Sequence, residues 1–169
     1  FLNTDAIHPK LSELLALRRL FGLRSSMNSV VRILNPANAK VAMQGIFHPN
    51  YGPRHQQASV SLGSAHSVAF KGEGGEAEIR PDADTKLHRV ANGKAITESW
   101  PRVFSSKQAP ADDISVNAIK AHWQNDTSAY GHAAIIATTA LALYVHSNAL
   151  THEQAMTTAE QLWQDRKPL

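Results

Sequence analysis

The chain has 169 residues, of which 43% are hydrophobic and 18% are charged, enough for one folded domain with its own apolar core. It contains no cysteine, so disulfide bonds and thiolate metal sites are excluded. Residues 1–60 carry seven Lys or Arg and two Asp or Glu, a net charge of +5, whereas the remaining residues carry ten and twelve, a net charge of −2. This asymmetry predicts an anionic partner for the first third, either a phosphorylated small molecule or a nucleic-acid backbone; solvated surface charge is the alternative.

The sequence contains no segment that predicts a membrane span or a secretion signal. The longest apolar run, residues 133–145, includes two threonines and is shorter than the roughly 20 residues that a membrane helix needs. The first residue is Phe1 rather than Met, and no signal-peptide pattern follows it. We therefore expect a cytoplasmic protein with no membrane partner, and a sequence that is part of a longer chain.

The first predicted elements are two helices, at residues 9–21 and 26–34, joined by a tight connection. Pro9 suits the first turn of a helix, and Gly22 suits the end of one. Arg24 lies in the connection, directly before the small polar residues that begin the second helix. Free backbone N–H groups, hydroxyls and a guanidinium in this order predict an anion site, the alternative being an arginine that merely caps the preceding helix.

The remainder of the chain predicts a strand-rich middle flanked by helices. Extended runs predict strands at residues 40–47, 66–71, 85–90 and 95–99, the last two joined by a hairpin turn at Asn92-Gly93. Apolar periodicity predicts helices at residues 54–62, 114–123 and 128–147, and a last helix that begins at a capping box of Thr151 and Gln154 and ends near Trp163. The helix at 128–147 is almost entirely apolar, so we expect it to be buried in one α/β domain that spans residues 1–169.

Short motifs follow one another along almost the whole chain. They are His8-Pro9, Leu20-Phe21-Gly22-Leu23-Arg24-Ser25, Asn28, Asn35-Pro36-Ala37, Gln44-Gly45-Ile46-Phe47-His48-Pro49, Leu62-Gly63-Ser64, Trp100-Pro101-Arg102-Val103-Phe104 and Asn117-Ala118-Ile119. Their types and order resemble the C-terminal part of the anthranilate phosphoribosyltransferase family. The resemblance implies an α/β domain of the phosphoribosyltransferase and nucleoside-phosphorylase type, with a central sheet flanked by helices. It also implies that the full-length protein is a homodimer and that an N-terminal helical region and a donor-binding loop lie outside these residues.

The same resemblance implies an activity and two binding residues. The family transfers a phosphoribosyl group from its pyrophosphate donor to anthranilate in tryptophan biosynthesis, with Mg²⁺ holding the diphosphate. Arg24 matches the family arginine that pairs with the carboxylate of the acceptor, and Asn28 matches an asparagine beside it. The glycine-rich donor loop Gly-Thr-Gly-Gly-Asp does not occur in the 169 residues, so we expect this segment alone to be inactive and assign it no catalytic residue.

Two departures from the family pattern affect the predicted function. Where the family has Leu-Gly-Pro-Leu, this chain has Val30-Val31-Arg32-Ile33, which adds a positive charge. Where the family has an Asp-Glu pair that binds magnesium, Ala77 takes the place of the aspartate and only Glu78 is in register. Glu76 becomes a second ligand only after a shift of one residue, so we expect the Mg²⁺ site to be weakened.

These departures resemble a divergent branch of the family that binds nucleic acid through basic helices. The residues expected to contact phosphate are Lys10, Arg18, Arg19, Arg24 and Arg32. Our first hypothesis is therefore an anthranilate phosphoribosyltransferase-like protein that has diverged towards non-specific nucleic-acid binding. The alternatives are a genuine phosphoribosyltransferase that acts on anthranilate or a related aromatic acid and binds the phosphoribosyl donor, and a packing module of a larger assembly.

Overall fold

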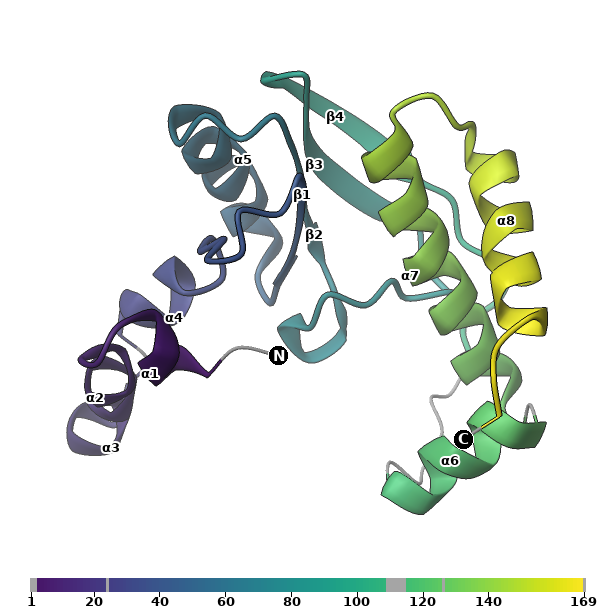
Figure 1. Ribbon diagram of the computed structural model, residues 1–169, viewed down its shortest axis with the longest axis horizontal. Helices are drawn as coiled ribbons and strands as arrows, with labels where there is room; N and C mark the ends of the chain where they lie inside the picture. Colours follow the sequence, from purple (N-terminus) through teal and green to yellow (C-terminus); the bar gives the residue numbers. More distant parts are fainter. Residues whose placement is uncertain (1–2, 24, 109–114, 126, 169) are drawn as a thin grey trace.

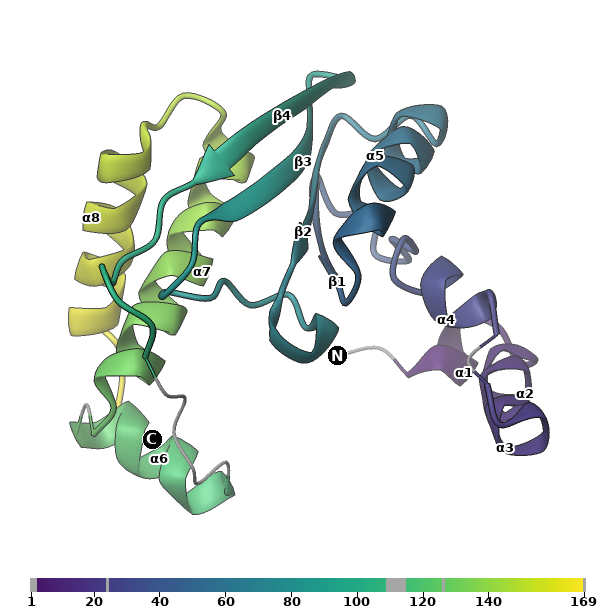
Figure 2. The same ribbon diagram turned by 180° about the vertical axis from the view of Figure 1, so that it is seen from behind.

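A four-stranded mixed sheet forms the centre of the computed structural model, which describes residues 3–23, 25–108, 115–125 and 127–168 (Figures 1 and 2). The strands are β1 (Val41–Ile46), β2 (His66–Lys71), β3 (Thr85–Ala91) and β4 (Lys94–Trp100), and they lie in this order across the sheet. β1 and β2 are parallel and are connected by α5, whereas β3 runs antiparallel to both β2 and β4. All four predicted strands and the α/β class are confirmed.

The helices form three groups around this sheet. They are α1 (Thr4–Ile7), α2 (Leu11–Ala16), α3 (Arg18–Phe21) and α4 (Met27–Val30) before the sheet, η1 (Pro49–Tyr51), α5 (Gly52–Ser61) and η2 (Glu73–Gly75) between its strands, and α6 (Val116–Asn125), α7 (Ala129–Ser147) and α8 (His152–Gln164) after it. α5 covers one face of the sheet, α7 covers the other, and α8 packs on the outer side of α7 (Figure 1). α1 to α4, here called the N-terminal arm, pack mainly on one another at the side of the domain.

The core lies between the sheet and α7. Val68, Phe70 and Leu87 contribute its sheet side, and each is fully buried. α7 contributes small and branched side chains, among them Ala137 and Leu141, which are likewise inaccessible to solvent. The buried position predicted for this apolar helix is therefore confirmed. Because side chains alternate along a strand, the residues next to these core positions point to the opposite face, towards α5.

The predicted helix at 9–21 is wrong as a single element, since the structure divides it into α2 and α3 at Leu17. The Leu20 N–H bonds to the Leu17 carbonyl, three residues back, which tightens the last turn. Gly22 then ends α3 with a φ of +66°, as predicted. Leu20 and Phe21 are 79% and 67% exposed, so the end of the apolar stripe that predicted one continuous helix packs on no described surface, whereas Leu11 at its start is buried. The second predicted helix is likewise shorter than expected, because only α4 of residues 26–34 is α-helical.

The segment after β2 folds back against the end of β1. A Cβ added to Gly45 would lie 2.2 Å from the Glu76 carbonyl oxygen, and one added to Gly72 would lie 1.8 Å from it. Glycine at both positions therefore allows this backbone contact. The contact brings residues 76–78 to the carboxyl end of β1.

The predicted hairpin turn and helix cap are both confirmed. Asn92 and Gly93 have positive φ values of 50° and 74° in the β3–β4 hairpin, and the capping box of Thr151 and Gln154 begins α8.

Among the described residues, no helix taken singly has both the length and the apolar character to cross a membrane. α6 and α7 meet both conditions only when the two helices are counted together, and a bend of 79° separates them.

Candidate functional site

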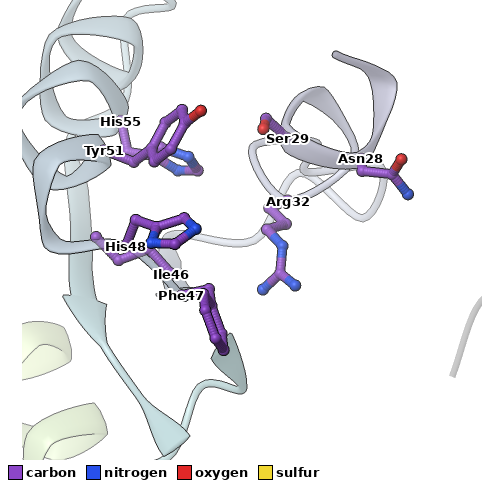
Figure 3. A pocket seen from close by; sticks show the side chains of 8 residues that line it. All are labelled: Asn28, Ser29, Arg32, Ile46, Phe47, His48, Tyr51 and His55. Carbon is purple, nitrogen blue, oxygen red and sulfur yellow. The ribbon is translucent and has the colours of Figure 1, made fainter. Parts of the chain in front are cut away.

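A cavity of about 220 Å³ lies between α4 and the segment that follows β1, and we call it the α4 cavity (Figure 3). Its lining comes from α4 and from Arg32, two residues beyond its end, on one side, and from the end of β1, η1 and α5 on the other. The lining residues are Asn28, Ser29, Arg32, Ile46, Phe47, His48, Tyr51 and His55. The cavity lies at the carboxyl end of a parallel strand, the position at which open α/β sheets usually bind ligands.

Arg32 connects the two walls of the α4 cavity. Its Nη1 donates a hydrogen bond to the Gly45 carbonyl oxygen at 2.7 Å and a second to the Gly75 carbonyl oxygen. The half-buried guanidinium therefore joins the segment after α4 to both β1 and η2. Figure 3 shows its end group near Phe47, and a guanidinium has further N–H donors beyond Nη1. Arg32 thus serves the fold and also supplies a fixed positive charge to the cavity.

A buried polar relay places a neutral imidazole on the opposite wall. His55 Nδ1 lies 3.0 Å from Gln44 Oε1, and Gln44 Nε2 donates to Ser59 Oγ at 3.2 Å. With the amide in this orientation, Nδ1 carries the proton and the lone pair of the imidazole is on Nε2. Burial and the nearby Arg32 charge lower the pKa of His55, so the ring is neutral at neutral pH. The lining of the α4 cavity therefore combines the cation of Arg32 with the uncharged imidazole of His55.

The predicted basic residues do not all lie at one place. Arg18 and Arg19 are both exposed and line a surface hollow of about 470 Å³ together with Ser12, Leu15 and Ala16, which we call the α3 hollow. Lys10 is exposed and pairs with Glu13, with 3.1 Å between Nζ and Oε2. Arg32 lines the α4 cavity instead, and Arg24 lies outside the described residues.

Of the two residues predicted to bind the acceptor, Asn28 and Arg24, only Asn28 lies in the described part of the chain. Asn28 lines the α4 cavity, and its Oδ1 is buried without a hydrogen-bond partner among the described residues. In Figure 3 its amide points away from Tyr51 and His48, whereas Ser29 lies on the side that faces them. The role of Asn28 stays a prediction, as does that of Arg24, which lies outside the described residues.

The two predicted magnesium ligands lie close together on the surface. Glu76 and Glu78 are both exposed, on either side of Ala77. Partial desolvation, together with repulsion from Glu73 and Glu76, raises the pKa of Glu78. No group of three or more His, Asp or Glu in the described part of the chain is arranged to hold a metal ion. Two carboxylates do not by themselves complete the octahedral shell of a magnesium ion, which usually takes its other oxygens from water and bound phosphates.

Several site residues were missed at the sequence level. His48, Tyr51 and His55 line the α4 cavity, but the sequence assigns them only to a turn and a helix. The signal available in the sequence was a polar residue inside a predicted strand, Gln44, and another in the helix that follows it, His55. The structure buries both, with only 4% and 3% of their surface exposed. Buried polar groups require partners, so their presence on a strand and the following helix indicates a network between them.

A sheet of this type with a cationic cavity at a strand end is typical of α/β domains that bind small ligands. The chain belongs to the family described as "Glycosyl transferase family, a/b domain", whose model matches residues 1–167. Its fold matches that of a variant anthranilate phosphoribosyltransferase from Saccharomyces cerevisiae solved with Mg bound. The TM-score is 0.72 at 14% identity, over 93% of this chain and 48% of that one.

Sequence relatives agree with this assignment. The anthranilate phosphoribosyltransferase of Acetivibrio thermocellus is 24% identical over all of this chain and 51% of its own length. That of Polynucleobacter necessarius is 28% identical over 64% of this chain and 32% of its own length. An uncharacterized protein of Aquifex aeolicus is 31% identical over 71% of this chain and 38% of its length. The chain thus spans about half, or less, of the length of these relatives.

The link made by Arg32 can be tested by Arg32→Met, which keeps the apolar stem and removes the donors. We expect the full-length protein to lose about 1–3 kcal/mol of unfolding free energy, because two carbonyl groups are deprived of a charged donor. Urea denaturation measures this loss. The control Arg18→Met, at an exposed position, should change stability by less than about 0.5 kcal/mol. Equal effects of the two variants would contradict the structural role of Arg32.

The crowding of carboxylates at Glu78 predicts a pH-dependent gain of stability in Glu78→Gln. Because the folded-state pKa is raised above the ordinary value of 4.5, ionisation of Glu78 costs folding free energy once the pH exceeds that value. The variant should therefore melt at a higher temperature than the parent at pH 7, and at the same temperature well below pH 4.5. Thermal unfolding across this range provides the measurement, and a variant less stable at pH 7 would refute the prediction.

Proposed function

We propose that the full-length protein is an anthranilate phosphoribosyltransferase-like member of its family that binds nucleic acid without sequence preference through the N-terminal arm. The observation that carries this proposal is the pair of adjacent exposed arginines on α3, Arg18 and Arg19. Neither forms an ion pair with another described residue, and both line the α3 hollow. Guanidinium groups bind phosphate oxygens through paired hydrogen bonds, and such contacts give affinity that does not depend on base sequence.

Two further features support the proposal. The first 60 residues have a net charge of +5, which favours association with a polyanion. Ala77 takes the place of the aspartate expected in the magnesium pair, so that only Glu78 is in register, which weakens one requirement of the transferase reaction. As part of the same proposal, the full-length protein is cytoplasmic, and it is a homodimer, as the resemblance of its sequence implies.

The test is the salt dependence of DNA binding by the full-length protein. We expect micromolar or tighter binding of a mixed-sequence duplex at low salt, with a linear fall of log K against log salt. The double variant Arg18→Gln/Arg19→Gln should bind more weakly. Its slope should be shallower by about 0.9 for each phosphate that the variant no longer neutralises.

Fluorescence anisotropy of a labelled duplex gives both quantities. Lys94→Gln, on the β3–β4 hairpin, removes an exposed charge outside the arm and should leave affinity and slope unchanged. The absence of binding, or a slope that the arginine pair does not alter, rules out this interface.

A second candidate function is transfer of a phosphoribosyl group to anthranilate or a related aromatic acid. The α4 cavity favours it, because an arginine, a neutral histidine and aromatic side chains line a space next to the segment that carries the acceptor motif. A carboxylate is attracted to Arg32, and an aromatic ring suits the walls formed by Phe47 and Tyr51.

This candidate predicts turnover of the phosphoribosyl donor by the full-length protein when anthranilate and Mg²⁺ are supplied. Arg24→Ala should lower kcat/KM by about a hundredfold if it binds the acceptor carboxylate, as removal of a charged hydrogen bond implies. Lys94→Ala, at an exposed position of the β3–β4 hairpin, serves as the control. The fluorescence of anthranilate follows the reaction, and no turnover above the rate without protein would eliminate this candidate.

A further inference from the structure

A second cavity, of about 430 Å³, lies on the α5 face of the sheet, and we call it the α5 cavity. It is formed by the start of α5, the end of β2 and the start of β3, and it shares only Ile46 with the α4 cavity. Its charged lining residues are Lys71, Arg80, Asp84 and Lys86. The basic residues of the N-terminal arm take no part in it.

Two of these charged residues are neutralised by partners. Arg80 pairs with Asp82, with 3.1 Å between Nη2 and Oδ1, and its Nε lies 3.4 Å from Glu73 Oε2. Asp84 binds Arg102, whose Nε and Nη2 each donate to one carboxylate oxygen at 3.1 Å. The uncompensated charge of the cavity is therefore that of two lysines, Lys71 and Lys86, which form no ion pair in the described part of the chain.

The register of the sheet brings these two lysines together. β2 and β3 are antiparallel, with Phe70 opposite Leu87, so the same register continued by one residue sets Lys71 opposite Lys86. Both point to the α5 face, because Phe70 and Leu87 point into the core on the other face. Like charges directly opposite on neighbouring strands destabilise a sheet. An anion bound between the two ammonium groups removes this repulsion.

His88 supplies an independent indication of a ligand. It is only 6% exposed, it lines the α5 cavity, and its Nδ1 is buried without a partner among the described residues. Its ring lies against the start of α5, since a Cβ on Gly52 would come within 2.1 Å of His88 Cδ2. Burial and Lys86 lower the pKa of His88, so the ring is neutral without a ligand and gains affinity for a proton when an anion arrives.

We propose that the α5 cavity binds the phosphate group of a small phosphorylated molecule, held between Lys71 and Lys86 beside the His88 ring. The volume of 430 Å³ exceeds that of a phosphate ion and lies in the range of cavities that bind small organic ligands. The first residues of α5, a ten-residue helix without a side-chain N-cap, add the positive end of a helix dipole. This site does not rest on the proposed function, since it uses none of the same residues.

The experiment measures binding of two probes, inorganic phosphate and glycerol 3-phosphate, to the full-length protein by calorimetry. We expect Lys71→Gln and Lys86→Gln each to weaken binding by about tenfold or more, as removal of one charged hydrogen bond implies. Lys94→Gln, an exposed lysine of β4, is the matched control and should bind as the parent does. Tighter binding of glycerol 3-phosphate than of phosphate assigns the site to an organic phosphate. Equal or weaker binding contradicts the part of the proposal that concerns an organic ligand.

A thermal-unfolding experiment distinguishes a ligand site from a purely structural role of the two lysines. Without ligand, Lys86→Gln should be as stable as the parent or more stable, because the repulsion is removed. Phosphate should stabilise the parent more than chloride does at the same ionic strength, and should stabilise the two lysine variants less. A parent that responds equally to phosphate and chloride overturns the proposal. So do lysine variants that lose stability without ligand, because the lysines would then serve the fold.

Discussion

The guanidinium of Arg32 holds together parts of the chain that have few other contacts with each other. Its hydrogen bonds to the carbonyl oxygens of Gly45 and Gly75 connect the end of the N-terminal arm to β1 and to the loop after β2. The same loop reaches β1 only because Gly45 and Gly72 lack side chains. The position of the arm, the walls of the α4 cavity and the placement of residues 76–78 therefore all depend on this cluster of backbone contacts around one cation.

Arg32 also illustrates how family membership and local divergence combine. The chain belongs to a glycosyltransferase family, but Val30-Val31-Arg32-Ile33 replaces the Leu-Gly-Pro-Leu step that the family resemblance leads one to expect. The residue that departs from the pattern is the one that makes the link to the sheet. A charged side chain that bonds two carbonyls in a half-buried position is fixed in place, so this divergence changes the wall of a cavity as well as the surface charge.

Sequence reasoning succeeded where local rules decide the structure. The four strands, the Asn92-Gly93 hairpin, the buried helix α7 and the cap of α8 follow from alternation, turn chemistry and periodicity over a few residues. Sequence reasoning failed where residues distant in the sequence determine the local structure. The break of the first helix at Leu17 and the partners of Arg32, 13 and 43 residues away, are not encoded in any local pattern. The relay from His55 through Gln44 to Ser59 similarly requires a strand and a helix to be brought together first.

The α4 cavity has one wall on the N-terminal arm and the other on the sheet, and the arm packs mainly on itself. The distance between the two walls is therefore set by the hydrogen bonds of Arg32 to Gly45 and Gly75 and not by the packing of the core beneath α7.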